Sequence, residues 1–253
     1  MLKHRVIPVL LLNDVDLVKT KKFKNPSYIG DPINAIRIFN DKEVDELVVI
    51  DISASKKGVD PNYALIEEFA GECFMPLTYG GGIQNLDQAE KLFKLGIEKI
   101  CIHSAALNNI GIISKLKDRF GSSSIVVSVD IYRDLFNRPK LFNSVSRKKS
   151  PRDWLEYISN VQKAGAGEIL LNSVSKDGTL DGPDLELIKI ASKCLKIPLI
   201  SVGGISSLHD IKRAVECGSD AVAAGAFFVY HGQHRAVLIS YPNYSELEAL
   251  FRA

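Results

Sequence analysis

The chain has 253 residues, a formal net charge of +2, 46% hydrophobic residues and 25% charged residues. This composition is ordinary for a folded protein and leaves room for one large domain or two small ones. Nothing in it indicates a nucleic acid or a membrane as a partner. The first residues, MLKHRVIP, hold too short an apolar stretch for a signal peptide, and no later run could span a membrane. We therefore expect a cytoplasmic protein.

Eight short apolar runs alternate with helical patterns along the whole chain. Strands are predicted at 6–11, 47–52, 76–79, 99–102, 125–130, 168–172, 198–202 and 221–224. Helix starts are predicted at Asp31-Pro32, at Asp60-Pro61 and at Asn85 with Gln88, and helix ends at Gly96, Gly165 and Gly218. Eight such units in one domain, residues 1–253, favour α/β architecture of the closed (β/α)8 (TIM) barrel type over an open sheet.

An internal repeat supports this fold. Segment 75–106 aligns without gaps with segment 197–228, so that Gly81-Gly82-Ile83 stands opposite Gly203-Gly204-Ile205. Segment 45–58 likewise echoes 167–178. The repeat predicts two (βα)4 half-barrels, about 1–122 and 123–253, related by a pseudo-twofold axis.

The repeated glycine turns predict two anion sites at the mouth of the barrel. Glycines let backbone N–H groups approach a ligand, and a following helix N-terminus favours negative charge. The residues expected to bind phosphate are Gly81, Gly82, His103 and Ser104 at one site and Gly203, Gly204, Ala224 and Gly225 at the other, with Asp177, Gly178 and Thr179 as further donors. Two sites predict a phosphorylated small molecule charged at both ends. Alternatively, the glycines only form tight turns and His103 is structural.

The cysteines give no sign of a metal site. Cys73, Cys101, Cys194 and Cys217 lie far apart, without a CxxC spacing or a nearby pair of histidines. They are typical of reduced core residues, and metal binding is the less favoured alternative. We expect neither a metal nor a cofactor.

The segments RVIP, DELVVIDISAS, YGGGIQ, IHSAA, GAGEILLNSVSKDGT and VGGI resemble the cyclase subunit of imidazole glycerol phosphate synthase, over essentially the whole chain. The resemblance implies a glutaminase partner at the N-terminal face of the barrel. It implies ammonia passage through the barrel to a bis-phosphorylated ribonucleotide, with a charged gate at the floor formed by Arg5, Glu46, Lys99 and Glu168. The alternative for these four residues is a salt-bridge plug that closes the floor.

The resemblance breaks at the first strand. The family uses two aspartates as acid and base; Asp130 matches one of them, and Leu11 stands where the other belongs. A proton-shuttling carboxylate contributes roughly 10²–10⁴ in rate, which leucine cannot supply. Lys19, in the loop expected after the first strand, matches a lysine that closes over the substrate phosphates. The alternative is that the lysine run there is a solvated, flexible face.

Other segments, above all HGQHRAVLISYP at 231–242, resemble the cyclase-subunit paralogue that accompanies bacterial surface-polysaccharide genes. That resemblance implies a role in making acetamidino sugars, with a dedicated glutaminase and a separate sugar amidotransferase that receives the ammonia. Two alternatives stay open. One is a histidine-pathway cyclase that works with one aspartate, and the other is a non-catalytic ammonia conduit and scaffold.

Overall fold

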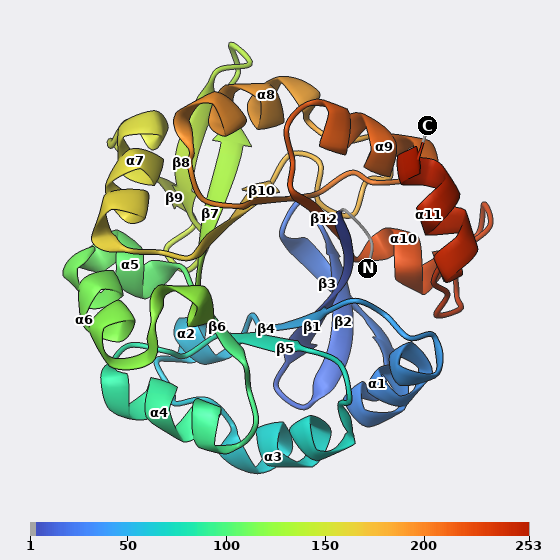
Figure 1. The fold of residues 1–253 in the computed structure, drawn as a ribbon, viewed down its shortest axis with the longest axis horizontal. Coiled ribbons are helices and arrows are strands. Elements are labelled where there is room, and N and C mark those ends of the chain that lie inside the picture. Colours follow the sequence, from blue (N-terminus) through green and yellow to red (C-terminus); the bar gives the residue numbers. More distant parts are fainter. Residues whose placement is uncertain (1–3, 253) are drawn as a thin grey trace.

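The computed structural model describes residues 4–252, and its centre is a closed barrel of eight parallel strands (Figure 1). Around the barrel the strands follow the order β1 (Arg5–Asn13), β4 (Leu47–Asp51), β5 (Leu77–Gly80), β6 (Lys99–Ile102), β7 (Ile125–Arg133), β10 (Glu168–Ser173), β11 (Leu199–Val202) and β12 (Ala221–Ala224), which pairs again with β1. All eight predicted strands are confirmed. The (β/α)8 barrel is confirmed with them.

Helices surround the barrel on its outside (Figure 1). They are α1 (Pro32–Asp41), α2 (Ala54–Lys57), α3 (Tyr63–Glu72), α4 (Leu86–Lys94), α5 (Ser104–Asn108), α6 (Gly111–Phe120), α7 (Trp154–Ala164), α8 (Leu185–Cys194), α9 (Leu208–Glu216), α10 (Ala226–Val229) and α11 (Tyr244–Arg252), with a 3-10 turn at Ser122–Ser124. Within residues 4–252, none of these helices has the length and apolar character needed to cross a bilayer.

One predicted helix start is wrong. Helix α3 begins at Tyr63 and not beside Pro61, because Asn62 caps it by accepting a hydrogen bond from the Leu65 amide at 3.3 Å. The Asp60 carboxylate serves another helix, since it accepts a hydrogen bond from Gln88 Nε2 at 2.6 Å. The predicted start of α1 is confirmed, with Asp31 as its cap.

The two halves repeat the same local devices. Asn85 and Gln88 form a capping box at the start of α4, and 122 residues later Ser207 accepts from the Asp210 amide at the start of α9. The turn glycines share positive φ angles as well: 119° at Gly81 and 110° at Gly203, 73° at Gly82 and 89° at Gly204. The sequence repeat therefore corresponds to a repeat of backbone conformation.

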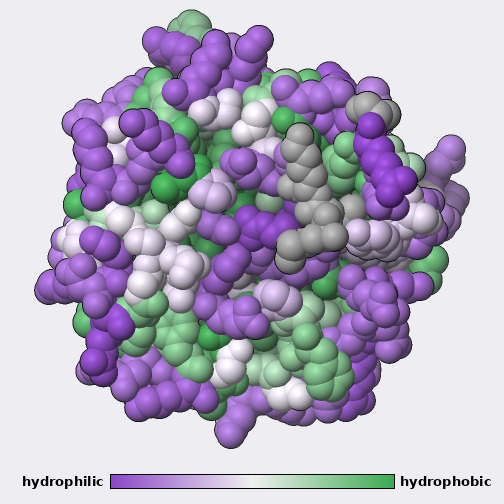
Figure 2. Space-filling model, viewed as in Figure 1, coloured by the Kyte–Doolittle hydropathy of each residue, from purple (hydrophilic) through white to green (hydrophobic). Residues whose placement is uncertain are grey.

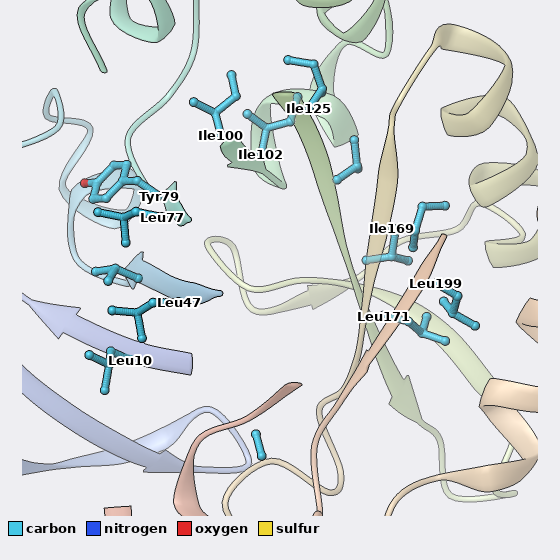
Figure 3. Packing of buried hydrophobic residues seen from close by; sticks show 14 of the residues in the cluster. Leu10, Leu47, Leu77, Tyr79, Ile100, Ile102, Ile125, Ile169, Leu171 and Leu199 are labelled. Carbon is cyan, nitrogen blue, oxygen red and sulfur yellow. The ribbon is translucent and has the colours of Figure 1, made fainter. Parts of the chain in front are cut away.

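Each barrel strand buries both of its faces. One set of apolar side chains packs outward against the helices, as Figure 3 shows for Leu10, Leu47, Leu77 and other residues. The other set fills the barrel axis and comprises Ile7, Val9, Val48, Cys101, Val126, Leu170, Ile200, Ala221 and Ala223. Because successive side chains alternate across a strand, Leu11 faces the axis between the outward-facing Leu10 and Leu12.

Within residues 4–252, six strands outside the barrel were not predicted. They are β2 (Asp16–Lys21), which forms the first hairpin with β3 (Lys24–Gly30); β8 (Pro139–Asn143), which pairs with β9 (Lys148–Lys149); and β13 (Tyr230–His231), which pairs with β14 (Ala236–Val237). The sequence predicts a loop at Lys19, with a solvated, flexible face as the alternative; instead Lys19 is buried on β2, because the lysine run forms the first hairpin. Its two turn residues, Lys22 and Phe23, both have positive φ angles (54° and 59°), a type I′ geometry usually carried by Asn-Gly.

Candidate functional site

A pocket of about 160 Å³ lies at the carboxyl ends of the barrel strands. It is lined by Asp130 and by all but one of the residues predicted to bind phosphate: Lys19, Gly81, Gly82, His103, Ser104, Asp177, Gly178, Gly203, Gly204, Ala224 and Gly225. Thr179 is the exception, because its hydroxyl turns into its own loop and donates to the Lys176 carbonyl at 2.9 Å. Repeat and strand-end reasoning thus located the pocket.

Asp130 stands at the bottom of this pocket beside a histidine. It is 4% exposed, it accepts a hydrogen bond from Ser128 Oγ at 3.3 Å, and its Oδ2 lies 3.3 Å from His103 Nε2. Burial raises the pKa of Asp130, and His103 opposes part of this rise. The two side chains thus lie within ion-pair distance of each other.

The orientation of the histidine ring is set by the backbone. His103 Nδ1 lies 2.9 Å from the Ser128 carbonyl oxygen, and a carbonyl only accepts, so Nδ1 carries a proton. Nε2 is buried and makes no hydrogen bond within residues 4–252, although Asp130 is near. Nε2 is therefore the ring atom that can exchange a proton in the pocket.

The first strand offers no acid or base at the mouth. Its contributions to the pocket lining are Val9 and Leu11, and Leu11 packs with Ile50 and Val202 on top of the apolar axis. The mouth therefore has a carboxylate on β7 and an apolar wall on β1.

The second glycine cradle holds a buried amine. Lys19 is 6% exposed and donates from Nζ to the Val9 carbonyl at 3.2 Å. A Cβ on Gly225 would lie 1.8 Å from this Nζ, so only glycine leaves room for the amine. Burial lowers the pKa of Lys19, and Asp177 opposes the shift. Lys19 and Gly225 form one unit beside the Gly203-Gly204 turn.

The first glycine cradle is built differently. The Gly82 amide already donates to Ser55 Oγ at 3.0 Å, and a Cβ on Gly81 would lie 2.4 Å from the Asp51 carbonyl oxygen. Close packing alone therefore requires glycine at position 81, as the tight-turn alternative supposed. Ser55 and Ser104 also line the pocket at this cradle.

The loop after β10 fastens the first hairpin. Asp177 Oδ2 accepts from Thr20 Oγ1 at 2.8 Å and from the Phe23 amide at 3.1 Å. A Cβ on Gly178 would lie 2.1 Å from the Thr20 carbonyl oxygen. Asp177 and Gly178 thus hold the hairpin that carries Lys19.

The segment singled out as distinctive, 231–242, braces the same loop. Arg235 donates to the carbonyls of Gly178 and Thr179, both at 3.1 Å, and its guanidinium lies 6.0 Å from the Tyr230 ring centroid. The Tyr230 hydroxyl lies 3.4 Å from Ser27 Oγ on β3. Sequence reasoning noted the segment without identifying this contact.

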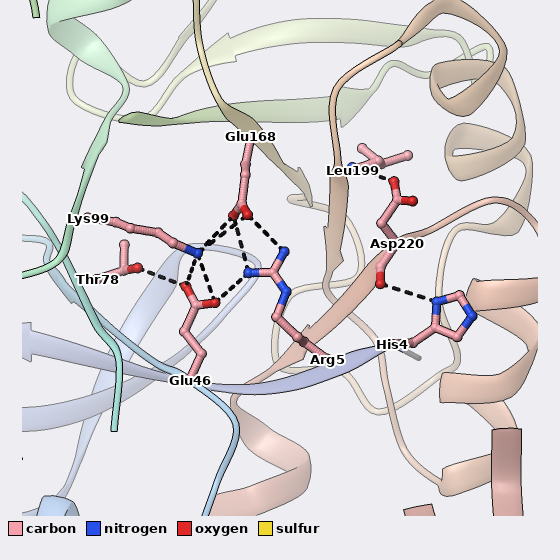
Figure 4. Close-up of polar contacts among 8 residues, drawn as sticks. All are labelled: His4, Arg5, Glu46, Thr78, Lys99, Glu168, Leu199 and Asp220. Carbon is pink, nitrogen blue, oxygen red and sulfur yellow. Dashed lines mark hydrogen bonds and ion pairs between the residues drawn. The ribbon is translucent and has the colours of Figure 1, made fainter. Parts of the chain in front are cut away.

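At the opposite end of the barrel, the four predicted floor residues form a closed ring of ion pairs (Figure 4). Arg5 contacts Glu46 and, at 2.9 Å, Glu168; Lys99 contacts Glu46 at 3.1 Å and Glu168 at 3.4 Å. Thr78, which was not predicted, donates to Glu46 at 2.9 Å. Two acids and two bases thus neutralise one another across the axis.

Burial and charge act in opposite directions on this ring. Burial disfavours the charged form of Arg5, but Glu168 and Glu46 outweigh it and raise the pKa of Arg5. Figure 2 shows hydrophilic residues gathered at the centre of the barrel end where β1 begins, with hydrophobic residues around them. Above the ring, the barrel axis is apolar up to Leu11 and Val202. No group of three His, Cys, Asp or Glu side chains within residues 4–252 is placed to hold a metal.

Comparison with known proteins places this site in context. Residues 5–235 match the family described as "Histidine biosynthesis protein". The chain is 50% identical over 250 residues to the Pseudomonas aeruginosa protein named "Putative imidazole glycerol phosphate synthase subunit hisF2", covering 98% of this chain and 99% of that one. It is 49% identical over 253 residues to a Leptospira borgpetersenii protein named "Putative imidazole glycerol phosphate synthase subunit HisF" (99% and 100% covered). It is also 37% identical over 228 residues to the Dictyoglomus thermophilum imidazole glycerol phosphate synthase subunit HisF, covering 90% of each chain.

Proposed function

Because the chain belongs to the histidine biosynthesis protein family, as a HisF-like cyclase subunit, we propose that it is the synthase-side half of a two-subunit glutamine amidotransferase. In this proposal a glutaminase subunit docks at the N-terminal face, and its ammonia enters the barrel through the floor. A phosphorylated small molecule binds at the mouth. The observation that carries the proposal is the complete ring of Arg5, Glu46, Lys99 and Glu168 below an apolar axis.

The ring supports a gate for physical reasons. Each base contacts both acids, so one side chain can swing aside while the other still contacts the two carboxylates. Lys99 has the longer contact to Glu168, 3.4 Å, and the flexible stem that such a movement needs. The apolar axis above the ring favours neutral ammonia over ammonium, because an unpaired charge is costly to bury.

The residues at the mouth of the barrel indicate which molecule accepts the ammonia. Ring closure in the family takes an acid and a base on two strands, and Leu11 removes one of them. We therefore propose that the ammonia serves amination of a sugar by a separate amidotransferase, in the making of acetamidino sugars for surface polysaccharide. This agrees with the paralogue-like segment 231–242.

One observation favours a second candidate, the histidine-pathway cyclase. Asp130 and His103 lie close enough to share a proton, and the histidine then takes the part of the absent aspartate. Under this alternative the barrel converts the bis-phosphorylated ribonucleotide itself.

Turnover separates the candidates. The full chain is given ammonium salt and the ribonucleotide substrate, and its gene is introduced into a strain that lacks its histidine cyclase. The sugar proposal expects no turnover at ordinary cyclase rates and no growth without histidine. Turnover with growth would establish the cyclase instead.

Coupling tests the gate. With the glutaminase present, Arg5→Ala and Lys99→Ala should let glutamine hydrolysis proceed without matching amination. If both variants keep the two activities in step, the ring is only a plug. Stimulated glutamine hydrolysis without any amination under all conditions would favour the conduit and scaffold.

A further inference from the structure

Two basic side chains stand unneutralised over the first glycine cradle. Lys56, near the end of α2, and Arg147, in the turn after β8, both line the mouth pocket. Within the described part of the chain neither makes an ion pair with a carboxylate. The neighbouring Lys57, by contrast, pairs with Asp14 outside the pocket lining.

Neighbouring residues place both side chains near the first cradle. Ser55, the residue before Lys56, accepts from the Gly82 amide at 3.0 Å. Val145, two residues before Arg147, shares a second cavity with Ser55 and Ser104. The turn between β8 and β9, in the second half of the chain, thus reaches over the glycine cradle of the first half.

The two cations also act on each other. Burial lowers the pKa of Lys56, and the charge of Arg147 lowers it further. Like charges held side by side raise the free energy of the empty pocket, and an anion between them relieves this repulsion. Arg147 uses one N–H for the Phe23 carbonyl at 3.2 Å, which leaves the rest of its five donors for a ligand.

We propose that Lys56 and Arg147 bind a phosphate dianion at the first cradle, as a site distinct from the Lys19 site at the second cradle. The inference rests on the proposed function in one respect, namely that the mouth takes a phosphorylated ligand. It adds that the protein distinguishes the two ends of that ligand by binding each phosphate through different groups. One phosphate meets two solvent-accessible cations and the Ser104 hydroxyl, and the other meets backbone amides and one buried amine.

Inorganic phosphate is the probe that tests this site. Binding is followed by titration calorimetry and by ³¹P line broadening, in the full chain and in a Lys19→Ala background that isolates the first cradle. In that background, Lys56→Ala and Arg147→Ala should each weaken phosphate about three- to tenfold, and the double variant should abolish measurable binding. Arg147→Lys, which keeps the charge, should recover part of the loss.

Neighbouring residues provide matched controls. Lys57→Ala and Lys148→Ala each remove one exposed lysine adjacent to the proposed cations, and both should bind phosphate as the unaltered chain does. Equal weakening by these controls would reduce the effect to general surface charge and overturn the inference.

The inference and the proposed function fail in different ways. If the Lys56 and Arg147 variants keep full phosphate affinity while Lys19→Ala loses it, the first-cradle assignment is wrong and the phosphorylated ligand stands. If the unaltered chain binds no phosphate at either cradle, the phosphorylated ligand itself is refuted.

Discussion

The floor and the mouth of the barrel treat charge in opposite ways. At the floor two acids and two bases contact one another and leave no charge over. At the mouth, Lys56 and Arg147 have no carboxylate partner within residues 4–252, and Asp130 is buried with a raised pKa. A self-neutralised cluster is complete without a ligand, whereas the groups at the mouth are complete only with one. We therefore propose that the charges at the mouth serve a ligand, whereas those at the floor serve one another.

Breaking the floor should have the largest effect on stability. Glu46→Gln leaves Arg5 and Lys99 to share Glu168, so the free energy of unfolding should fall by about 3 kcal/mol. Urea denaturation measures this change. Glu72→Gln, which breaks an exposed pair with Arg37, is the control and should lower the free energy of unfolding far less. Similar losses of stability in both variants would mean that the ion pairs of the ring stabilise the fold no more than an exposed ion pair does.

The mouth should respond to pH in the opposite sense from an ordinary ion pair. Because burial raises the pKa of Asp130 in the folded chain, folding is not penalised below the ordinary aspartate pKa. As the pH rises through the raised value, the buried charge forms and stability falls. Asp130→Asn should lack this fall, so its advantage over the unaltered chain should grow from acidic to neutral pH. Parallel stability curves, from denaturation at several pH values, would contradict this prediction.

Displacing the buried amine should change ligand binding more than stability. Gly225→Ala places a methyl group where Lys19 Nζ lies, and a flexible lysine can move away at little cost. Phosphate affinity at the second cradle should fall about tenfold, as in Lys19→Ala, a loss of about 1.4 kcal/mol. Gly71→Ala, in α3 with open space around it, is the control and should leave phosphate affinity unchanged. Undiminished phosphate binding in Gly225→Ala would separate Lys19 from the anion site.

Loosening the brace should have the smallest effect. Arg235→Ala removes two hydrogen bonds to the carbonyls of Gly178 and Thr179, so amide exchange in β2 and β3 should quicken by about fivefold. Arg138→Ala, in the hairpin after β7 and paired with Asp134, should leave that exchange unchanged. Exchange that stays slow in Arg235→Ala would show that Asp177 alone holds the hairpin.

The sequence was sufficient for the barrel because its strands are buried on both faces. Runs such as 168–172 and 198–202 are short, apolar and bounded by turn residues, which is the pattern of a parallel strand between helices and an axis. The β2–β3 hairpin escaped prediction because Lys22 and Phe23 form a tight turn without glycine or asparagine. It is held by the tertiary contact between Asp177 and Thr20, which no local pattern records.

Within the site, sequence reasoning found the groups that recur and missed those defined by contacts. The repeat located both glycine turns, and family resemblance located Asp130 and the four floor residues. Small hydroxyls were missed: Ser55, Ser128 and Thr78 each hold a neighbouring site residue, yet serine and threonine are too common for their position to signal this. The prediction that Thr179 lines the pocket was wrong for a related reason. The direction of its hydroxyl depends on the folded loop, in which it donates to the Lys176 carbonyl.

The contact between Lys19 and Gly225 has a consequence for the evolution of the family. These two residues come from opposite halves of the chain, and a side chain at one position excludes the inward amine at the other. The pair should therefore vary together. Relatives with alanine or serine at the position of Gly225 should lack a lysine at the position of Lys19, or should hold that lysine outside the mouth. Selection should act against a substitution at either position alone.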